Sequence, residues 1–206
     1  MATNSGATEL PQSTPVLIGQ LLQRRKFIVN ESNKVTQFGK ETISSTSTVF
    51  LRDCNDCEYI IDGTCTKVMI ENCNNLVLKA NKKIVTSIIE VWKSQNVTLK
   101  INSQVQTLQL DDCHKVNVEY DSVKHFHSIV WTGTKELELT LLEDGEVKHK
   151  ITKTQEQESS NNSQPTQSII RLINGELVEE RLIRAEKGYP ITERELREWK
   201  QKNNVA

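Results

Sequence analysis

The stretch Leu51–Ile61, "LRDCNDCEYII", decides the fold of this 206-residue chain. It places Cys54 and Cys57 at CxxC spacing inside an apolar run. Such a pair suggests half of a zinc site or a redox pair, because both kinds of site need thiols close together. A third interpretation is that each cysteine fills a fixed position in a structural repeat. The flanking sequence distinguishes these interpretations.

Four further stretches have the same pattern, in which a short polar corner separates two apolar alternations: "VMIENCNNLVL" from Val68, "IEVWKSQNVTL" from Ile89, "LQLDDCHKVNV" from Leu108 and "IVWTGTKELEL" from Ile129. Successive corners are 19, 21, 19 and 21 residues apart when the stretches are aligned on Cys54, Cys73, Ser94, Cys113 and Thr134. Alternation with period two indicates strands, and a repeat near 20 residues is typical of a solenoid. The sequence therefore predicts an all-β fold, a right-handed parallel β-helix.

We expect about five clear coils from Val49 to Leu141, and a sixth, degenerate coil from Lys26 to Phe38. Val, Ile, Leu and Thr dominate the alternations, as strands prefer, and Asn and Asp supply the corners. In this register like residues stack above like residues, and the inward positions are Val49, Leu51, Val68, Ile70, Ile89, Val91, Leu108, Leu110, Ile129 and Trp131 on the first strands, with Cys57, Tyr59, Leu76, Leu78, Val97, Leu99, Val116, Val118, Leu137 and Leu139 on the second.

The repeat also assigns the cysteines. Cys54, Cys73 and Cys113 share one corner column, and Cys57 takes a place that Leu76 and its equivalents fill in the other coils. A buried thiol commonly acts as a small hydrophobe. We therefore expect structural cysteines, with no metal and no cofactor. Zinc or redox chemistry remains the alternative, because His114, His125 and His127 supply possible metal ligands.

Composition excludes several function classes. The net charge of −1 favours neither nucleic acid nor an anionic membrane as a partner. The sequence has no secretion signal and no apolar run of about 18 residues, so we expect a cytoplasmic protein with reduced thiols. It has no GxSxG, phosphate-binding glycine loop or HExxH, so we expect no catalytic residues and no enzymatic activity.

The outward positions of the first strands form a candidate partner-binding face. Phe50, Met69, Trp92 and Val130 are too apolar for bare solvent, whereas the second strands point Thr98, Asn117 and similar polar residues outward. An apolar patch with a charged border often marks a protein interface. The chain's own terminal segments are the alternative cover. The predicted face consists of Phe50, Arg52, Met69, Glu71, Glu90, Trp92, Gln109 and Asp111.

The C-terminal part carries a predicted hairpin. The expected organisation is a disordered tail at 1–15, the β-helix at 16–150, a polar linker at 151–167, a hairpin at 168–185 and a tail with a short helix at 186–206. Asn174–Gly175 between two apolar runs is a strong hairpin signal, because both turn residues need positive φ. The hairpin pairs either with its own solenoid or with a second copy, giving a swapped homodimer, and its predicted dimer residues are Ile170, Leu172, Asn174, Gly175, Leu177 and Leu182.

The terminal helix is predicted from about Glu193 to Gln201, because Thr192 and Glu195 have capping-box spacing behind Pro190. Leu196 and Trp199 lie three residues apart and are expected to pack locally.

The stretch "VFLRDCNDCEYIIDGTCTKVMIENCNNLVLKANKKI" (Val49–Ile84) and the coil "LQLDDCHKVNVEYD" (Leu108–Asp121) resemble the C-terminal β-helix domain of cyclase-associated proteins, within the superfamily shared with tubulin cofactor C. "TPVLIGQLLQRRKFIVNESNKV" is similar to the family's first strand, and "IIRLINGELVEERL" to its closing hairpin, which that family exchanges between two subunits. The resemblance covers roughly Pro15 to Ile183.

The resemblance implies a cytoskeleton-associated protein that binds ADP-loaded actin monomers and promotes nucleotide exchange and actin turnover as a homodimer. Two alternatives remain open, a non-catalytic cytoskeletal scaffold and a tubulin cofactor C-like adaptor. The GTPase-activating members of the latter branch present an arginine from a Q-x-R motif. Arg52 follows Phe50 and Leu51, with no glutamine two residues before it. We therefore expect no GTPase-activating arginine.

Overall fold

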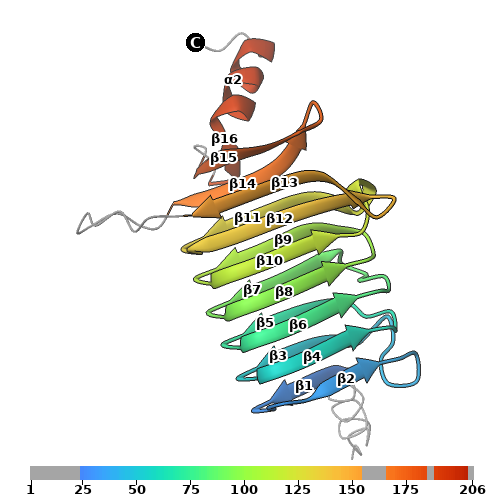
Figure 1. Ribbon diagram of the computed structural model, residues 1–206. Coiled ribbons are helices and arrows are strands. Elements are labelled where there is room, and N and C mark those ends of the chain that lie inside the picture. The colour runs from blue at the N-terminus through green and yellow to red at the C-terminus, as the bar shows by residue number, and fades with distance from the viewer. Residues whose placement is uncertain (1–23, 155–165, 185–187, 204–206) are drawn as a thin grey trace, which may run out of the picture.

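A computed structural model describes residues 24–154, 166–184 and 188–203 of the chain (Figure 1). The predicted disordered tail at 1–15 lies outside the described residues, as does most of the predicted linker, from 155 to 165.

The described chain winds into six stacked coils, each built from two strands (Figure 1). The degenerate coil predicted at Lys26–Phe38 is therefore confirmed as the first of them. The coils comprise, in order, β1 (Arg25–Val29) with β2 (Val35–Phe38), β3 (Thr48–Arg52) with β4 (Asn55–Ile61), β5 (Lys67–Glu71) with β6 (Asn74–Ala80), β7 (Ile88–Trp92) with β8 (Gln95–Ile101), β9 (Val105–Asp111) with β10 (His114–Tyr120), and β11 (Phe126–Thr132) with β12 (Glu136–Glu143).

Two sheets run along the solenoid. One has the order β1-β3-β5-β7-β9-β11, extended by C-terminal strands, and the other has the order β12-β10-β8-β6-β4-β2. Neighbouring coils pair in parallel and in the register that the repeat predicts, so that Leu51 pairs with Ile70 and Tyr59 with Leu78. A parallel β-solenoid results, as expected.

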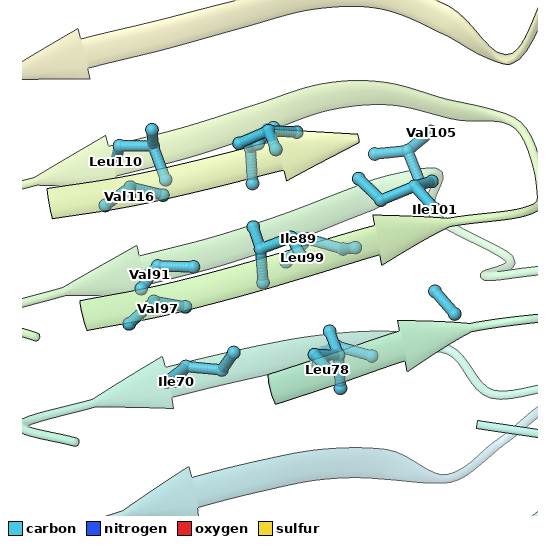
Figure 2. Packing of buried hydrophobic residues seen from close by; sticks show 14 of the residues in the cluster. Ile70, Leu78, Ile89, Val91, Val97, Leu99, Ile101, Val105, Leu110 and Val116 are labelled. Atoms are coloured by element: carbon cyan, nitrogen blue, oxygen red, sulfur yellow. The ribbon is translucent and has the colours of Figure 1, made fainter. Parts of the chain in front are cut away.

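The interior is a stack of aliphatic side chains from both sheets. Figure 2 shows residues of the two sheets pointing into the same interior, among them Ile70 and Leu78, Ile89 and Leu99, and Leu110 and Val116. All twenty predicted inward positions are buried, which confirms the predicted core. A single coil would leave its interior side chains exposed to solvent above and below, so each coil depends on the neighbouring coils to bury them.

The corners require left-handed backbone. In the position just before the corner column, Asp53, Asn72, Lys93, Asp112 and Gly133 have φ between 51° and 62°. Asn, Asp and Gly tolerate this region best, which explains why these residue types mark the repeat. Side chains of neighbouring coils also bond along the stack, since the Asn72 amide donates to the Asp53 carboxylate at 2.6 Å.

C-terminal strands close the last coil on both sheets. Strand β13 (Glu146–Thr154) pairs antiparallel with β12, and β14 (Gln167–Ile173) pairs antiparallel with β11. Strand β13 continues to Thr154, three residues beyond its last apolar residue, Ile151, because its pairing with β12 extends to Glu136. The first residues of the predicted linker are therefore strand.

The hairpin follows the prediction. Strands β14 and β15 (Glu176–Arg184) are antiparallel and joined by Asn174 and Gly175, whose φ angles are 53° and 85°. Strand β16 (Pro190–Thr192) adds to the far edge of β15, and helix α2 (Glu193–Lys202) follows. Thr192 and Glu195 form the predicted capping box. A 3-10 turn, η1 (Val123–His125), precedes β11.

We expect Leu99→Ala to lower the free energy of unfolding by about 2–5 kcal/mol, because Leu99 is fully buried between the sheets and the change leaves a cavity. Chemical denaturation of the full chain measures this change. The neighbouring exposed residue provides the control: Lys100→Ala should stay within about 0.5 kcal/mol of the parent. Equal effects of the two substitutions would contradict the assigned register.

Candidate functional site

The opening CxxC belongs to a hydrogen-bonded corner ladder. The Cys54 backbone N–H donates to Cys73 Sγ at 3.4 Å, and the Cys73 N–H donates to Ser94 Oγ at 3.1 Å. In the same column the Cys113 N–H donates to Thr134 Oγ1 at 3.3 Å. Each of these side chains also donates to the carbonyl two residues before it, as Cys73 Sγ does to Glu71 at 3.2 Å. Thiols and hydroxyls therefore have the same structural role.

Burial suppresses the reactivity of these thiols. All five cysteines are buried, and desolvation raises the pKa of Cys73 to about 12 and those of Cys65 and Cys113 to about 11. The thiolate is the nucleophile and the metal ligand, so a protonated thiol is poor at both. Within the described ranges, no three His, Cys, Asp or Glu side chains gather into a group that could hold a metal ion. The corner column is thus part of the fold.

The predicted partner-binding residues lie in two rows on the outer face of one sheet. Register places Phe50, Met69, Glu90, Gln109 and Val130 in one row. The residues two positions further along the same strands point to the same side and form a second row. This second row consists of Arg52, Glu71, Trp92, Asp111 and Thr132. The structure therefore brings the eight predicted residues onto one continuous surface, which we call the outer face.

Aromatic side chains gather at the N-terminal end of the outer face. The rings of Phe50 and Trp92 stack with centroids 5.9 Å apart, although their strands are separated by β5. The Trp92 side chain therefore reaches diagonally across strand β5 to the row that contains Phe50. Phe27 meets Phe50 edge to face at 5.3 Å and is 52% exposed.

Phe27 was missing from the predicted face. Its strand pairs in register with β3, which places Phe27 beside Phe50 and the 44% exposed Val29 beside Arg52. The signal was present in the sequence, since aligning "KFIVNESN" with the second coil gives the same pairing. The first coil has Glu31 at the corner position, where the other coils have Cys, Ser or Thr, so the corner column did not identify this alignment.

Charged residues border and cross the outer face. Glu90 pairs with Lys67 at 2.7 Å, and Arg52 approaches Glu71 at 3.6 Å and Asp53 at 3.3 Å. The Gln109 amide donates to the Asp111 carboxylate at 2.7 Å. These contacts pair the polar side chains of the outer face with one another. The surface is an apolar stripe with a frame of paired polar groups.

The C-terminal elements leave this end of the outer face uncovered. Helix α2 stands beyond β15 and β16, at the opposite end of the solenoid from β1 and β3 (Figure 1). The alternative cover by the described C-terminal segment therefore does not apply to Phe27, Phe50 and Trp92. Residues 1–23 lie outside the described part of the chain.

The predicted hairpin residues divide between core, turn and edge. Ile170 is fully buried opposite Ile129, and Leu172 and Leu177 pack against the core. Asn174 and Gly175 form the exposed turn, and Leu182 pairs with Thr192 of β16. In the described chain the hairpin thus closes the last coil of its own solenoid.

An ion network attaches helix α2 to the hairpin. Arg171 of β14 pairs with Glu195 at 2.6 Å and with Glu180 at 2.8 Å, and Arg194 pairs with Glu180 at 2.9 Å. Although partial burial opposes it, hydrogen bonds from Arg194 and Arg171 hold the pKa of Glu180 below its usual value. No residue of α2 is buried, and Trp199 is 53% exposed. Polar contacts therefore dominate the attachment of the helix.

Comparison with protein families gives a match over residues 19–172 to the adenylate cyclase-associated (CAP) C-terminal family. This range contains all six coils, strand β13 and all but the last residue of β14. The chain belongs to this family. Strands β15 and β16 and helix α2 lie beyond the matched range, so they extend the part that the family model describes. The sequence resemblance to cyclase-associated proteins is confirmed.

A solved structure supports the same fold. The crystal structure of cyclase-associated protein from Cryptosporidium parvum is similar, with a TM-score of 0.55 and 18% sequence identity, over 88% of this chain and 98% of that one. The comparison with curated proteins finds no match. In the part of the chain that the structure describes, no helix is long and apolar enough to cross a membrane.

We expect the five thiols of the folded protein to resist DTNB at pH 8, because all five are buried out of reach of the reagent. In denaturing urea all five should react. Absorbance of the released thiolate counts the reacted groups in both conditions. Rapid reaction of two thiols in the native protein would contradict the structural role and restore the redox interpretation of the CxxC pair.

Proposed function

We propose that this protein binds actin monomers, preferentially in the ADP-loaded form, and promotes their nucleotide exchange. Membership of the cyclase-associated protein C-terminal family supports this proposal. The single observation that carries the choice of surface is the aromatic cluster Phe27, Phe50 and Trp92 on the outer face. Apolar and aromatic side chains at this density on one face indicate a protein partner.

The outer face has the composition of an interface. Aromatic residues and Met69 occupy its N-terminal half, while Arg52, Glu71 and Glu90 lie among and beside them. Binding energy at an interface is usually concentrated in a few aromatic residues, with Trp prominent among them. The polar frame adds specificity. A protein with mismatched charges would desolvate these groups without offering them hydrogen bonds or ion pairs in return.

Such a protein acts without covalent chemistry. A partner that binds one conformation of actin better than another shifts the actin population toward that conformation. If the favoured conformation releases ADP faster, exchange accelerates. The solenoid suits this role because its stacked coils hold the backbone of the binding residues at a fixed spacing. Little backbone conformational entropy is therefore lost on binding.

We also propose a homodimer formed by exchange of the hairpin, which would carry Ile170, Leu172, Leu177 and Leu182 onto a second solenoid. The connection has more length than closure within one chain needs. Thr154 pairs with Glu136 and Gln167 with Thr132, so the two ends flank a single corner. The eleven residues 155–165 between them could extend to roughly 35–40 Å. The same hydrogen bonds can therefore form within or between copies.

The primary test is release of a fluorescent nucleotide from ADP-actin monomers at micromolar concentrations of this protein. We expect faster release with the parent protein. Trp92→Ala should reduce binding by about 30-fold, as expected for the loss of about 2 kcal/mol at an aromatic interface residue. Glu71→Lys should also weaken binding by reversing one charge of the frame.

Lys100→Glu is the matched control for Glu71→Lys, because Lys100 is exposed on the opposite sheet. It should leave release unchanged, and thermal melting should show that each variant folds. Unchanged release with the parent protein and no measurable actin binding would contradict the proposal. That outcome would favour a cytoskeletal scaffold with a different partner.

The dimer has its own test. Deleting residues 168–206 should convert dimers into monomers, as measured by sedimentation velocity, because the exchanged segment is gone. Asn174→Ala with Gly175→Ala is a milder variant that disfavours the positive φ angles of the turn while keeping the strands. Dimers that persist after the deletion would rule out hairpin exchange.

A further inference from the structure

One corner of the solenoid departs from the residue pattern of the repeat. The left-handed position before the corner column holds Asp53, Asn72, Asp112 and Gly133 in four coils, but Lys93, with φ 53°, in the coil between them. Lys115, with φ 58°, occupies the left-handed position three residues further on, where other coils have Asp56, Asn75 and Asn96. Lysine, unlike Gly, Asn or Asp, is not favoured in left-handed backbone. Residues held in such strained conformations often serve a function.

Lys93 lines a surface hollow of about 530 Å³ on coils four to six, and the other lining residues are Gln95, Asp112, Cys113, His114, Gly133 and Lys135. Lys34, Lys67, Lys79, Lys150 and Lys153 form ion pairs, whereas Lys93 and Lys135 form none with a described residue. Their charge is therefore available to a ligand.

The one carboxylate in the hollow is turned toward the backbone. A Cβ at Gly133 would lie 2.3 Å from Asp112 Oδ1, so the glycine provides the space that the Asp112 side chain occupies. Among the lining residues, Lys93 and Lys135 against Asp112 leave a net positive charge, while Glu136, next to the lining, lies 3.5 Å from His114 Nε2. The hollow thus favours an anionic ligand.

The arrangement suits a row of carboxylates better than a single phosphate. The backbone N–H groups of Lys93, His114 and Lys135 already donate to Asp111, Ser94 and Cys113, at 2.9–3.0 Å. They cannot form the converging N–H cradle that commonly binds phosphate. The lysines instead lie on coils four and six, roughly 10 Å apart along the solenoid axis given the spacing of paired strands. Charges spread along an axis match an extended acidic peptide.

The hollow is continuous with the outer face. Lys93 follows Trp92, Asp112 follows Asp111 and Gly133 follows Thr132, and these three preceding residues form one row of that face. A partner on the outer face therefore extends naturally over this corner.

We propose that the corner hollow binds a segment of the partner protein rich in aspartate and glutamate, with Lys93 and Lys135 as its charge-recognition residues. The identity of that partner as actin rests on the proposed function; the acidic chemistry does not. Binding through these lysines weakens as salt rises, because the charges are exposed and screened.

The test uses the full chain and a fluorescein-labelled hexaglutamate peptide, with fluorescence anisotropy at low and physiological salt. The parent should bind the peptide at low salt, and the double variant Lys93→Glu/Lys135→Glu should lose at least tenfold in affinity. The matched control, Lys100→Glu/Lys148→Glu, reverses two exposed charges on the other sheet and should lose less than threefold. No peptide binding by the parent, or equal losses in both double variants, would overturn the proposal.

Lys93→Asn separates function from folding. Asparagine suits the left-handed position, so the melting temperature should rise by about 2–4 °C while peptide affinity falls. Unchanged peptide affinity in this variant would count against the role of Lys93.

Actin binding measured on the same proteins distinguishes the two proposals. Peptide binding without actin binding would refute the proposed function and leave the acidic-peptide site standing. Actin binding that Lys93→Glu/Lys135→Glu leaves unchanged would refute the hollow as part of the actin contact and leave the proposed function standing.

Discussion

Parallel, in-register pairing between coils is the constraint on which the whole structure depends. Each coil offers the next one a row of backbone groups and a layer of aliphatic side chains, and neither is satisfied within one coil. The end coils therefore need other segments to cover their open edges and exposed aliphatic side chains. At the C-terminal end, β13 and β14 reverse direction and cover the last coil antiparallel, and Ile170 completes the core above Ile129.

The same constraint explains the cysteines. A corner residue that accepts from the N–H of the coil before it and donates to a carbonyl of its own coil must be small and carry one polar atom, which Cys, Ser and Thr all satisfy. Cys73 and Ser94 are therefore interchangeable in geometry, though not in chemistry. A stacked repeat produces cysteine spacings that resemble a metal motif, and burial then makes these thiols inaccessible to reagents.

The outer face follows from the same stacking. Residues 19–21 positions apart become neighbours, so aromatic residues that are far apart in the sequence gather into one surface. The sequence predicted the eight residues of this face because they follow the period. It missed Phe27, since the first coil lacks the corner residue used for alignment, and it did not predict the diagonal contact of Trp92 with Phe50, which depends on side-chain conformation.

The sequence by itself determined the period, the strand pairing, the twenty inward positions, the hairpin turn at Asn174–Gly175 and the capped helix, because each depends on local alternation or local backbone preference. Tertiary structure decided the rest. The continuation of β13 into a polar segment depends on hydrogen bonds to β12, and the attachment of α2 depends on Arg171, Glu180 and Arg194, which meet across β14, β15 and the helix. The charged hollow arises likewise, because lysines on separate coils line one hollow only once the coils stack. Contacts between residues far apart in the chain leave no periodic signal, so only the folded chain reveals them.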